Sequence, residues 1–293
     1  MSRLLLCIDD TDDVSKEIST GSIAEMIAEM MRSLGMRIVD GVTRHQLLLC
    51  EEIAYTSHNS SMCILGEGSR EQITTCVRRA EQLLIRYAVV GANPGLASCV
   101  WEDLSLYQEK TLIDFGKRAK RTVLSIEEAL HIADVCKVSL DTYGGDGTGQ
   151  IGALAGIGLR LSGNDGTFRG KVSFGIPGEI CTCKELKEAM GLQAVRRLDG
   201  ILLADGEQIC LKKQMKFALL DHKKVLVVKP SQNQIWEVCQ HAELYEKTRE
   251  TLIRHCCEHF LQDNDVEEQL DSQPGCWNCL YRRWTADKVE CMY

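Results

Sequence analysis

Residues 3–13 read RLLLCIDDTDD, a short apolar run that leads directly into four aspartates within five positions. The apolar run has the composition of a strand that is buried on both faces. Carboxylates this close repel one another, so the cluster destabilises the fold unless a cation lies among them. The stretch therefore predicts a buried strand whose end carries acids into a crevice that holds a cation.

The acids are Asp9, Asp10, Asp12 and Asp13. Hard oxygen ligands of this kind suit Mg²⁺, which takes one or two carboxylates together with substrate phosphates. The alternative is a solvated turn that also neutralises the start of the following helix. Such a turn needs one or two acids rather than four, and we therefore expect a site for Mg²⁺ and phosphate.

A second motif, GGDGTGQIG, spans residues 144–152. Gly147, Gly149 and Gly152 match the spacing of the dinucleotide fingerprint, after a predicted strand over 137–143 and before a predicted helix over 151–161. No Lys-Ser or Lys-Thr pair follows, so this is not a Walker loop, and a dinucleotide-binding enzyme would carry the motif near its first strand. The motif predicts phosphate binding at a helix N-terminus, and the alternative is a tight strand-to-helix turn alone.

The apolar periodicity predicts the order of the other elements. Helices are expected between an N-cap at Ser19 or Thr20 and a stop at Gly35, over 70–87, and over 126–135 behind the capping pair Ser125 and Glu128. Short strands are expected at 38–42, 46–50, 61–65 and 96–101. Residues 171–238 alternate in the short segments of a small β-rich unit, and a long amphipathic helix is expected over about 238–260.

The chain of 293 residues is 44% hydrophobic and 26% charged, which is typical of a globular protein of two or three domains. Its formal net charge is −8, so RNA or DNA would have to bind at local basic patches. The basic stretches KRAKR at 117–121 and YRRW at 281–284 are more typical of solvated surface than of such a patch.

Fifteen cysteines are scattered along the chain, unlike the framework of a small secreted domain. No signal-peptide pattern and no run of 18 apolar residues is present, so we expect a cytoplasmic protein without a membrane segment. Cys276 and Cys279 have zinc-knuckle spacing, with His255 and His259 as the best second pair. The alternative is a spacing that arises by chance in a cysteine-rich chain.

Six segments, taken in order, resemble the archaeal tRNA(Ile) agmatinylcytidine synthetases: IDDTDD (8–13), STG (19–21), TRHQLL (43–48), HNSS (58–61), ANPG (92–95) and GTGQIGALAGIG (147–158). The resemblance covers about residues 1–165. Members of that family use ATP and Mg²⁺ to phosphorylate the 2-carbonyl oxygen of the wobble cytidine, and agmatine then displaces the phosphate. Their OB-fold and zinc ribbon have no obvious counterpart here, so the chain resembles a shortened homologue.

The resemblance implies roles for individual residues. Asp9, Asp10 and Asp12 would hold the metal and the phosphates. Ser19 or Thr20 would be a catalytic hydroxyl that becomes phosphorylated, against the alternative of simple helix capping. The remaining candidates would bind the nucleotide: Asn59, in place of the Asn of the family's RGN segment, and the loop residues Gly145, Asp146, Gly147, Thr148 and Gly149, with Gly152 from the fingerprint.

The resemblance also implies a kinase-like α/β core split around a ferredoxin-like insert. Together with the sequence pattern after residue 168, it predicts an α+β fold with a small β-rich C-terminal unit ending in a helix. The expected core comprises 1–59 and 111–168, and the insert comprises 60–110. The β-rich unit would span 169–238, and a helix with a Cys-containing tail would span 239–293.

The sequence thus predicts an ATP- and Mg²⁺-dependent phosphotransfer or ligase-type enzyme, with tRNA and agmatine or another amine as candidate partners. One alternative is a nucleotide- or RNA-binding module whose ATP site is vestigial. Another is a small-molecule kinase or ligase unrelated to tRNA.

Overall fold

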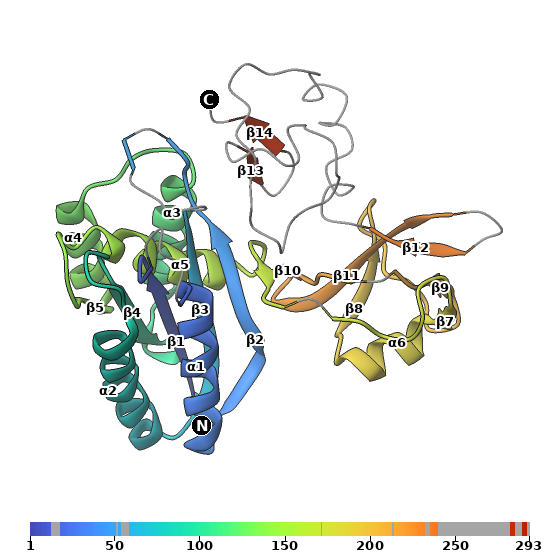
Figure 1. Ribbon diagram of the computed structural model, residues 1–293, viewed down its shortest axis with the longest axis horizontal. Coiled ribbons are helices and arrows are strands. Elements are labelled where there is room, and N and C mark those ends of the chain that lie inside the picture. Colours follow the sequence, from blue (N-terminus) through green and yellow to red (C-terminus); the bar gives the residue numbers. More distant parts are fainter. Residues whose placement is uncertain are drawn as a thin grey trace. The chain divides into compact units, whose positions relative to one another are not determined.

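The computed structural model describes residues 1–12, 18–50, 52–53, 59–170, 172–212, 214–231 and 235–239, with the backbone of 282–284 and 289–291. The chain divides into two compact units, residues 1–162 and 163–293, each described by itself (Figure 1). No helix among the described residues is long and apolar enough to cross a membrane.

Five strands form the sheet of the first unit, in the order β5-β4-β1-β3-β2, and every neighbouring pair is antiparallel. Their bounds are β1 Ser2–Asp9, β2 Arg37–Gln46, β3 Ser60–Gly68, β4 Gly95–Val100 and β5 Ser139–Thr142. The register places Cys7 opposite Cys63, and β2 carries an irregularity between Ile38 and Val42. The sheet is thus centred on β1, as its apolar run predicts.

Helices cover both faces of this sheet (Figure 1). One face packs against α1 Thr20–Ser33 and α2 Arg70–Tyr87, and the other against α3 Leu106–Ala119, α4 Ile126–Cys136 and α5 Gly149–Ser162. Strand β1 alternates between the two cores: Leu4, Leu6 and Ile8 face α1 and α2, whereas Leu5 and Cys7 face α3 and α5. This alternation explains why the whole strand is apolar.

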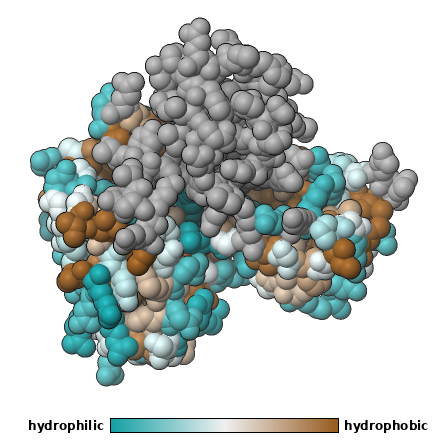
Figure 2. Space-filling model, in the orientation of Figure 1, coloured by the Kyte–Doolittle hydropathy of each residue, from teal (hydrophilic) through white to brown (hydrophobic). Residues whose placement is uncertain are grey.

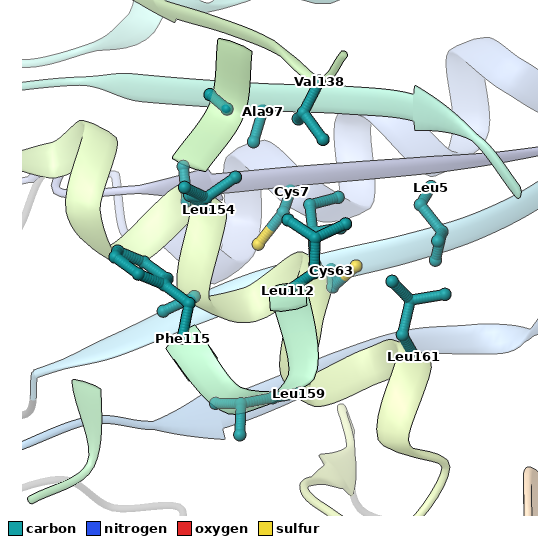
Figure 3. Close-up of a cluster of buried hydrophobic side chains, with 14 of the residues drawn as sticks. Leu5, Cys7, Cys63, Ala97, Leu112, Phe115, Val138, Leu154, Leu159 and Leu161 are labelled. Atoms are coloured by element: carbon teal, nitrogen blue, oxygen red, sulfur yellow. The ribbon is translucent and has the colours of Figure 1, made fainter. Parts of the chain in front are cut away.

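Figure 3 shows the second of these cores, where leucines of α5 meet Leu112 and Phe115 of α3 over the sheet. Two glycines let α3 and α5 approach closely. A Cβ on Gly116 would lie 2.7 Å from the Ala155 carbonyl oxygen, and one on Gly158 would lie 1.9 Å from that of Leu112. Side chains at these positions would push the helices apart, so α5 is held tightly against its surroundings.

The second unit has a sheet in the order β6-β10-β11-β12-β9-β7, with β8 beside β11 and, among its described residues, one helix, α6. The bounds are β6 Thr167–Phe168, β7 Ile180–Thr182, α6 Cys183–Met190, β8 Ala194–Arg197, β9 Gln208–Cys210, β10 Ala218–Leu220, β11 Lys223–Pro230 and β12 Trp236–Val238. A separate antiparallel pair joins β13 Arg282–Trp284 to β14 Val289–Cys291. Figure 2 shows apolar patches on this unit, which exposes Ile176, Ile201 and Leu202.

The α+β class and the β-rich character of the second unit are confirmed. The strand predicted at 46–50 is wrong, because β2 ends at Gln46 and Leu47–Leu49 are buried without joining a strand. Helices α3 and α6 were not anticipated. Residues 240–281, which hold most of the expected long helix and both Cys276 and Cys279, lie outside the described residues, as do Asp13 and His58.

Residues 60–110 supply β3, α2 and β4 to the same sheet as β1. The order β1-α1-β2-β3-α2-β4, with β4-β1-β3-β2 side by side, is the ferredoxin-like split arrangement, and it therefore spans 2–100 rather than a separate insert. The kinase-like description of the core and the finer division of the chain stay predictions.

Candidate functional site

The acidic turn after β1 and the glycine loop before α5 lie against each other. A Cβ on Gly149 would stand 3.1 Å from Cβ of Asp10, and one on Gly152 would stand 1.5 Å from Oδ2 of Asp9. The turn at 92–95 completes the junction, because the Asn93 carbonyl oxygen is 2.0 Å from the Cβ position of Gly149. Two motifs that are about half the chain apart in sequence therefore form one site.

Three acids of the turn have different surroundings. Asp9 ends β1 and is buried, with 7% of its surface exposed. Asp10 has a φ of 53°, a left-handed conformation that Asp and Asn adopt more readily than most residues. Oδ2 of Asp12 accepts the backbone N–H of Thr20 (2.9 Å), so this carboxylate is engaged at the start of α1.

Burial and neighbouring charges raise the pKa of Asp9 and of Asp10. Burial raises the pKa of Asp9 well above its ordinary value, and the charges of Asp10 and Asp12 raise it further, against a backbone hydrogen bond from Asp10. Burial also raises the pKa of Asp10; a hydrogen bond from Asn93 lowers it, whereas the charges of Asp12 and Asp146 raise it. The turn therefore favours protons or a cation over three free carboxylates.

The glycine loop is ordered by its own side chains. Oδ1 of Asp146 accepts both the backbone N–H (3.0 Å) and the hydroxyl (2.7 Å) of Thr148, and these bonds lower the pKa of Asp146. Gly147 has a φ of 87°, which a residue with a side chain rarely adopts. The loop is thereby bent into the first turn of α5.

Two buried amides of the loop lack a protein acceptor among the described residues. The amides of Asp146, Thr148, Gln150 and Ile151 each donate to a protein acceptor. Within the described part of the chain, the amides of Gly147 and Gly149 have no protein acceptor, although both glycines are buried. Buried amides are normally hydrogen-bonded, and the N-terminus of a helix favours an anion as the acceptor.

Asn93 links the loop to the acids. Its Nδ2 donates to Oδ2 of Asp10 (3.2 Å), and its Oδ1 accepts the backbone N–H of Asp146 (2.9 Å). Oδ1 also fills the space beside Gly145, whose Cβ would lie 1.8 Å away. Asn93 was not among the predicted site residues. The ANPG segment was the available signal, but the sequence alone reads it as a turn.

The hydroxyl groups of Ser19 and Thr20 have different hydrogen-bond partners in the structure. Ser19 is the N-cap of α1: its hydroxyl accepts the N–H of Ser22 (3.2 Å) and lies 2.9 Å from the Ser22 hydroxyl. Thr20 is buried, and its Oγ1 accepts the hydroxyl (3.1 Å) and the N–H (3.4 Å) of Thr11. The buried Thr11, which the sequence reasoning missed, therefore holds Thr20 next to the acids.

Asn59 lies at another part of the sheet edge. Its Nδ2 donates to the Leu48 carbonyl (2.7 Å), and its own carbonyl accepts the N–H of Leu47 (2.7 Å). A Cβ on Gly152 would stand 3.0 Å from a side-chain carbon of Leu47. Asn59 is therefore linked to the site through its hydrogen bonds to Leu47 and Leu48. Its predicted contact with a nucleotide stays a prediction.

The donor set suits Mg²⁺ only in part. Among the described residues, no group of three His, Cys, Asp or Glu side chains could hold a metal ion. The carboxylates of Asp9 and Asp10 offer hard oxygens, whereas one oxygen of Asp12 is taken by the Thr20 amide. This fits an ion that takes two carboxylates and completes its shell with phosphates and water, but not an all-protein cage.

No family model and no curated protein matches the chain. Among solved structures, it resembles apo TiaS, a tRNAIle2 agmatidine synthetase, with 24% identity and a TM-score of 0.46 over 53% of this chain and 35% of that one. It also resembles TiaS in complex with its tRNA and ATP, with 26% identity and a TM-score of 0.47 over 54% and 36% of the two chains. A tRNA fluorescent labelling enzyme matches with 25% identity and a TM-score of 0.45, over 53% of this chain and 36% of that one.

The match spans about a third of the length of those proteins.

Proposed function

We propose that the chain is an ATP- and Mg²⁺-dependent phosphotransfer enzyme that modifies tRNA. The observation that carries the proposal is the junction of the acidic turn with the amides of Gly147 and Gly149. One side of this junction attracts a cation and the other attracts an anion. A metal–nucleotide pair supplies both charges within a few ångströms.

The glycine loop would bind the phosphates. The two glycine amides and the N-terminal end of α5 favour negative charge, and neither requires a basic side chain. The N–H of Asp146 is already used by Asn93, and that of Thr148 by Asp146, so these bonds shape the loop rather than contact the nucleotide. The loop is therefore set before the nucleotide arrives, which lowers the cost of binding.

Asp9 and Asp10 would hold the Mg²⁺ ion together with the phosphates. A bound Mg²⁺ would supply positive charge beside the phosphate oxygens, where negative charge develops during phosphoryl transfer. Asp9 is the last residue of β1 and Asp10 follows it, so both carboxylates lie at the end of this strand. The missing side chain at Gly152 leaves the space that Asp9 occupies. Asp12 anchors the first turn of α1 through Thr20, so its role is to position that turn.

Thr20 is the proposed reactive hydroxyl. Its oxygen already accepts two hydrogen bonds from Thr11, which leaves its own proton available to a neighbouring acceptor. Ser19 is instead the helix cap. Thr20 would act at the acceptor end of the phosphate chain. Its oxygen would attack the terminal phosphorus of ATP, its proton would pass to a carboxylate of the acidic turn, and ADP would leave.

The proposed substrates are ATP, tRNA and agmatine or another amine. The resemblance of the sequence motifs suggests them, and the solved TiaS complexes contain that enzyme's tRNA together with ATP, or with AMPCPP and agmatine. A cytoplasmic location is part of the proposal, because no disulfide joins the described cysteines.

The test is an assay of the full chain with Mg²⁺ and ATP labelled at the α- or γ-phosphate, with and without bulk tRNA and agmatine. The expected result is nucleotide cleavage that needs Mg²⁺ and rises when tRNA is added. Agmatine labelled with carbon-14 should then become attached to RNA. Nucleotide cleavage that ignores tRNA but follows a metabolite would assign the site to a small-molecule kinase. Absence of ATP binding would contradict the proposal altogether.

A further inference from the structure

Among the described residues, Asn93 is the one side chain that makes hydrogen bonds to both halves of the junction described above. It donates to the Asp10 carboxylate through Nδ2 and accepts from the Asp146 amide through Oδ1, so its two polar side-chain atoms contact elements that are far apart in sequence. Its backbone carbonyl adds a third contact, against the start of α5 at Gly149. A residue used only to make a turn has no need of this pairing.

The surroundings of Asn93 fix its geometry. The following residue is Pro94, whose carbonyl accepts the N–H of Tyr143 (3.0 Å) and so ties the turn to the end of β5. Behind it, Gly95 must lack a side chain, because its Cβ would lie 2.2 Å from the Gly149 carbonyl oxygen. Gly145 must also lack one, because its Cβ would collide with Oδ1 of Asn93. The side-chain amide of Asn93 is therefore held between the backbone of the 92–95 turn and the backbone of the glycine loop.

We propose that Asn93 is a positioning residue that sets the spacing between the Asp10 carboxylate and the glycine-loop amides, so that one nucleotide can engage both. This inference rests on the proposed nucleotide-binding function. One arm is the hydrogen bond from the Asp146 amide to Oδ1 of Asn93, and the other is the hydrogen bond from Nδ2 of Asn93 to the Asp10 carboxylate. The two arms make separable contributions, because each uses a different atom of one side chain.

The separation of the two arms can be tested by substitution. The variant Asn93→Asp keeps an oxygen for the Asp146 amide but replaces the donor to Asp10 with a carboxylate oxygen that repels it, whereas Asn93→Ala loses both contacts. A matched control lies in the other unit, where Oδ1 of Asn164 likewise accepts the backbone N–H of an aspartate, Asp221 (3.0 Å). The controls are therefore Asn164→Asp and Asn164→Ala.

For Asn93→Ala we expect KM for ATP to rise and kcat to fall, each about tenfold or more, because both arms are lost and charged hydrogen bonds carry large contributions. For Asn93→Asp we expect KM for ATP to stay within about threefold of wild type and kcat to fall by about tenfold at most. The Asn164 variants should leave both constants unchanged. A structural role alone would instead lower activity equally in both Asn93 variants and in proportion to lost stability.

Hydrogen exchange of the Asp146 amide, measured without nucleotide, separates this inference from the proposed function. Exchange should be faster by about tenfold or more in Asn93→Ala and close to wild type in Asn93→Asp. If the wild-type chain binds no ATP, the proposed function fails. The exchange data then still test whether Oδ1 of Asn93 protects the Asp146 amide. Equal exchange in both variants, or kinetic constants like those of the Asn164 controls, would overturn the inference.

Discussion

The carboxylate of Asp9 occupies the space that a side chain at position 152 would need: a Cβ on Gly152 would stand 1.5 Å from Oδ2 of Asp9. The end of β1 and the first turn of α5 are thus in direct contact through an acid and a glycine. This contact explains why the glycine motif of residues 144–152 ends with a glycine. It also joins the two chemical halves of the site.

Replacing Gly152 with Ala should therefore damage both fold and site. The methyl group must displace Asp9 or move α5, which is held against α3, and overpacking of this kind costs about 1–3 kcal/mol. We expect that loss in the free energy of unfolding, measured with urea, together with loss of ATP binding. The control is Gly206→Ala, where a Cβ meets nothing within 4 Å. Equal stability of the two variants would contradict the packing described here.

The raised pKa of Asp9 predicts how stability depends on pH. The folded protein keeps the Asp9 proton to a higher pH than the unfolded chain, so from about pH 4 upward the unfolded chain releases its proton first. The free energy of unfolding should then fall as pH rises toward the folded pKa. The slope should be smaller in Asp9→Asn, and smaller in wild type with Mg²⁺ and ATP. If the free energy of unfolding depended on pH in the same way in wild type and in Asp9→Asn, the charged form of Asp9 would not destabilise the fold.

Asp10→Asn separates charge from shape. Asn tolerates the left-handed backbone of position 10 as well as Asp does, and it removes one charge that opposes ionisation of Asp9. We expect a free energy of unfolding equal to wild type or slightly higher, with Mg²⁺-dependent ATP affinity at least about tenfold weaker by calorimetry. The exposed Asp141→Asn on β5 is the control and should bind like wild type. Wild-type affinity in Asp10→Asn would remove the metal role from this residue.

The hydroxyls at the start of α1 should behave differently when removed. Ser19→Ala loses the helix cap and should cost about 1 kcal/mol of stability with turnover nearly unchanged. Thr20→Val keeps the shape of the buried side chain but loses the hydroxyl, and should abolish turnover while ATP still binds. Steady-state kinetics and urea unfolding of the two variants decide the assignment. Loss of turnover in Ser19→Ala alone would reverse it.

Local patterns predicted much of the fold. The apolar run of β1, the periodicity of α2 and the capping residues Ser19 and Ser125 each predicted an element that the structure contains. Helix α3 was missed partly because few of its residues are buried: Leu112, Phe115, Gly116 and Ala119. In addition, Gly116 resembles a helix breaker in the sequence, whereas in the structure it is the point where α3 crosses α5. Helix α6 had a signal, the capping box of Thr182 and Glu185.

The apolar stretch after β2 was misread for a different reason. Leu47, Leu48 and Leu49 are buried, which resembles a strand, but the N–H of Leu48 donates to the Ala119 carbonyl at the end of α3 rather than to a neighbouring strand. Hydrophobicity reports burial and not the hydrogen-bond partner.

The two motifs of the site were visible in the sequence, but the bridge between them was not. Asp10 and Asn93 are 83 residues apart, and only the sheet, which places β4 next to β1, brings them together. The different roles of Ser19 and Thr20 also depend on a partner, Thr11, that has no signature of its own.

The most direct test of the central claim is whether one metal–nucleotide complex contacts both motifs. Mn²⁺ replaces Mg²⁺ in the complex with ATP, and its unpaired electrons broaden the NMR signals of nearby amides in the full chain. We predict that the amide signals of Asp10 and Thr11 broaden together with those of Gly147 and Gly149, while that of Ser2, at the opposite end of β1 from Asp9, broadens far less. Broadening at only one motif, or at neither, would contradict a shared site.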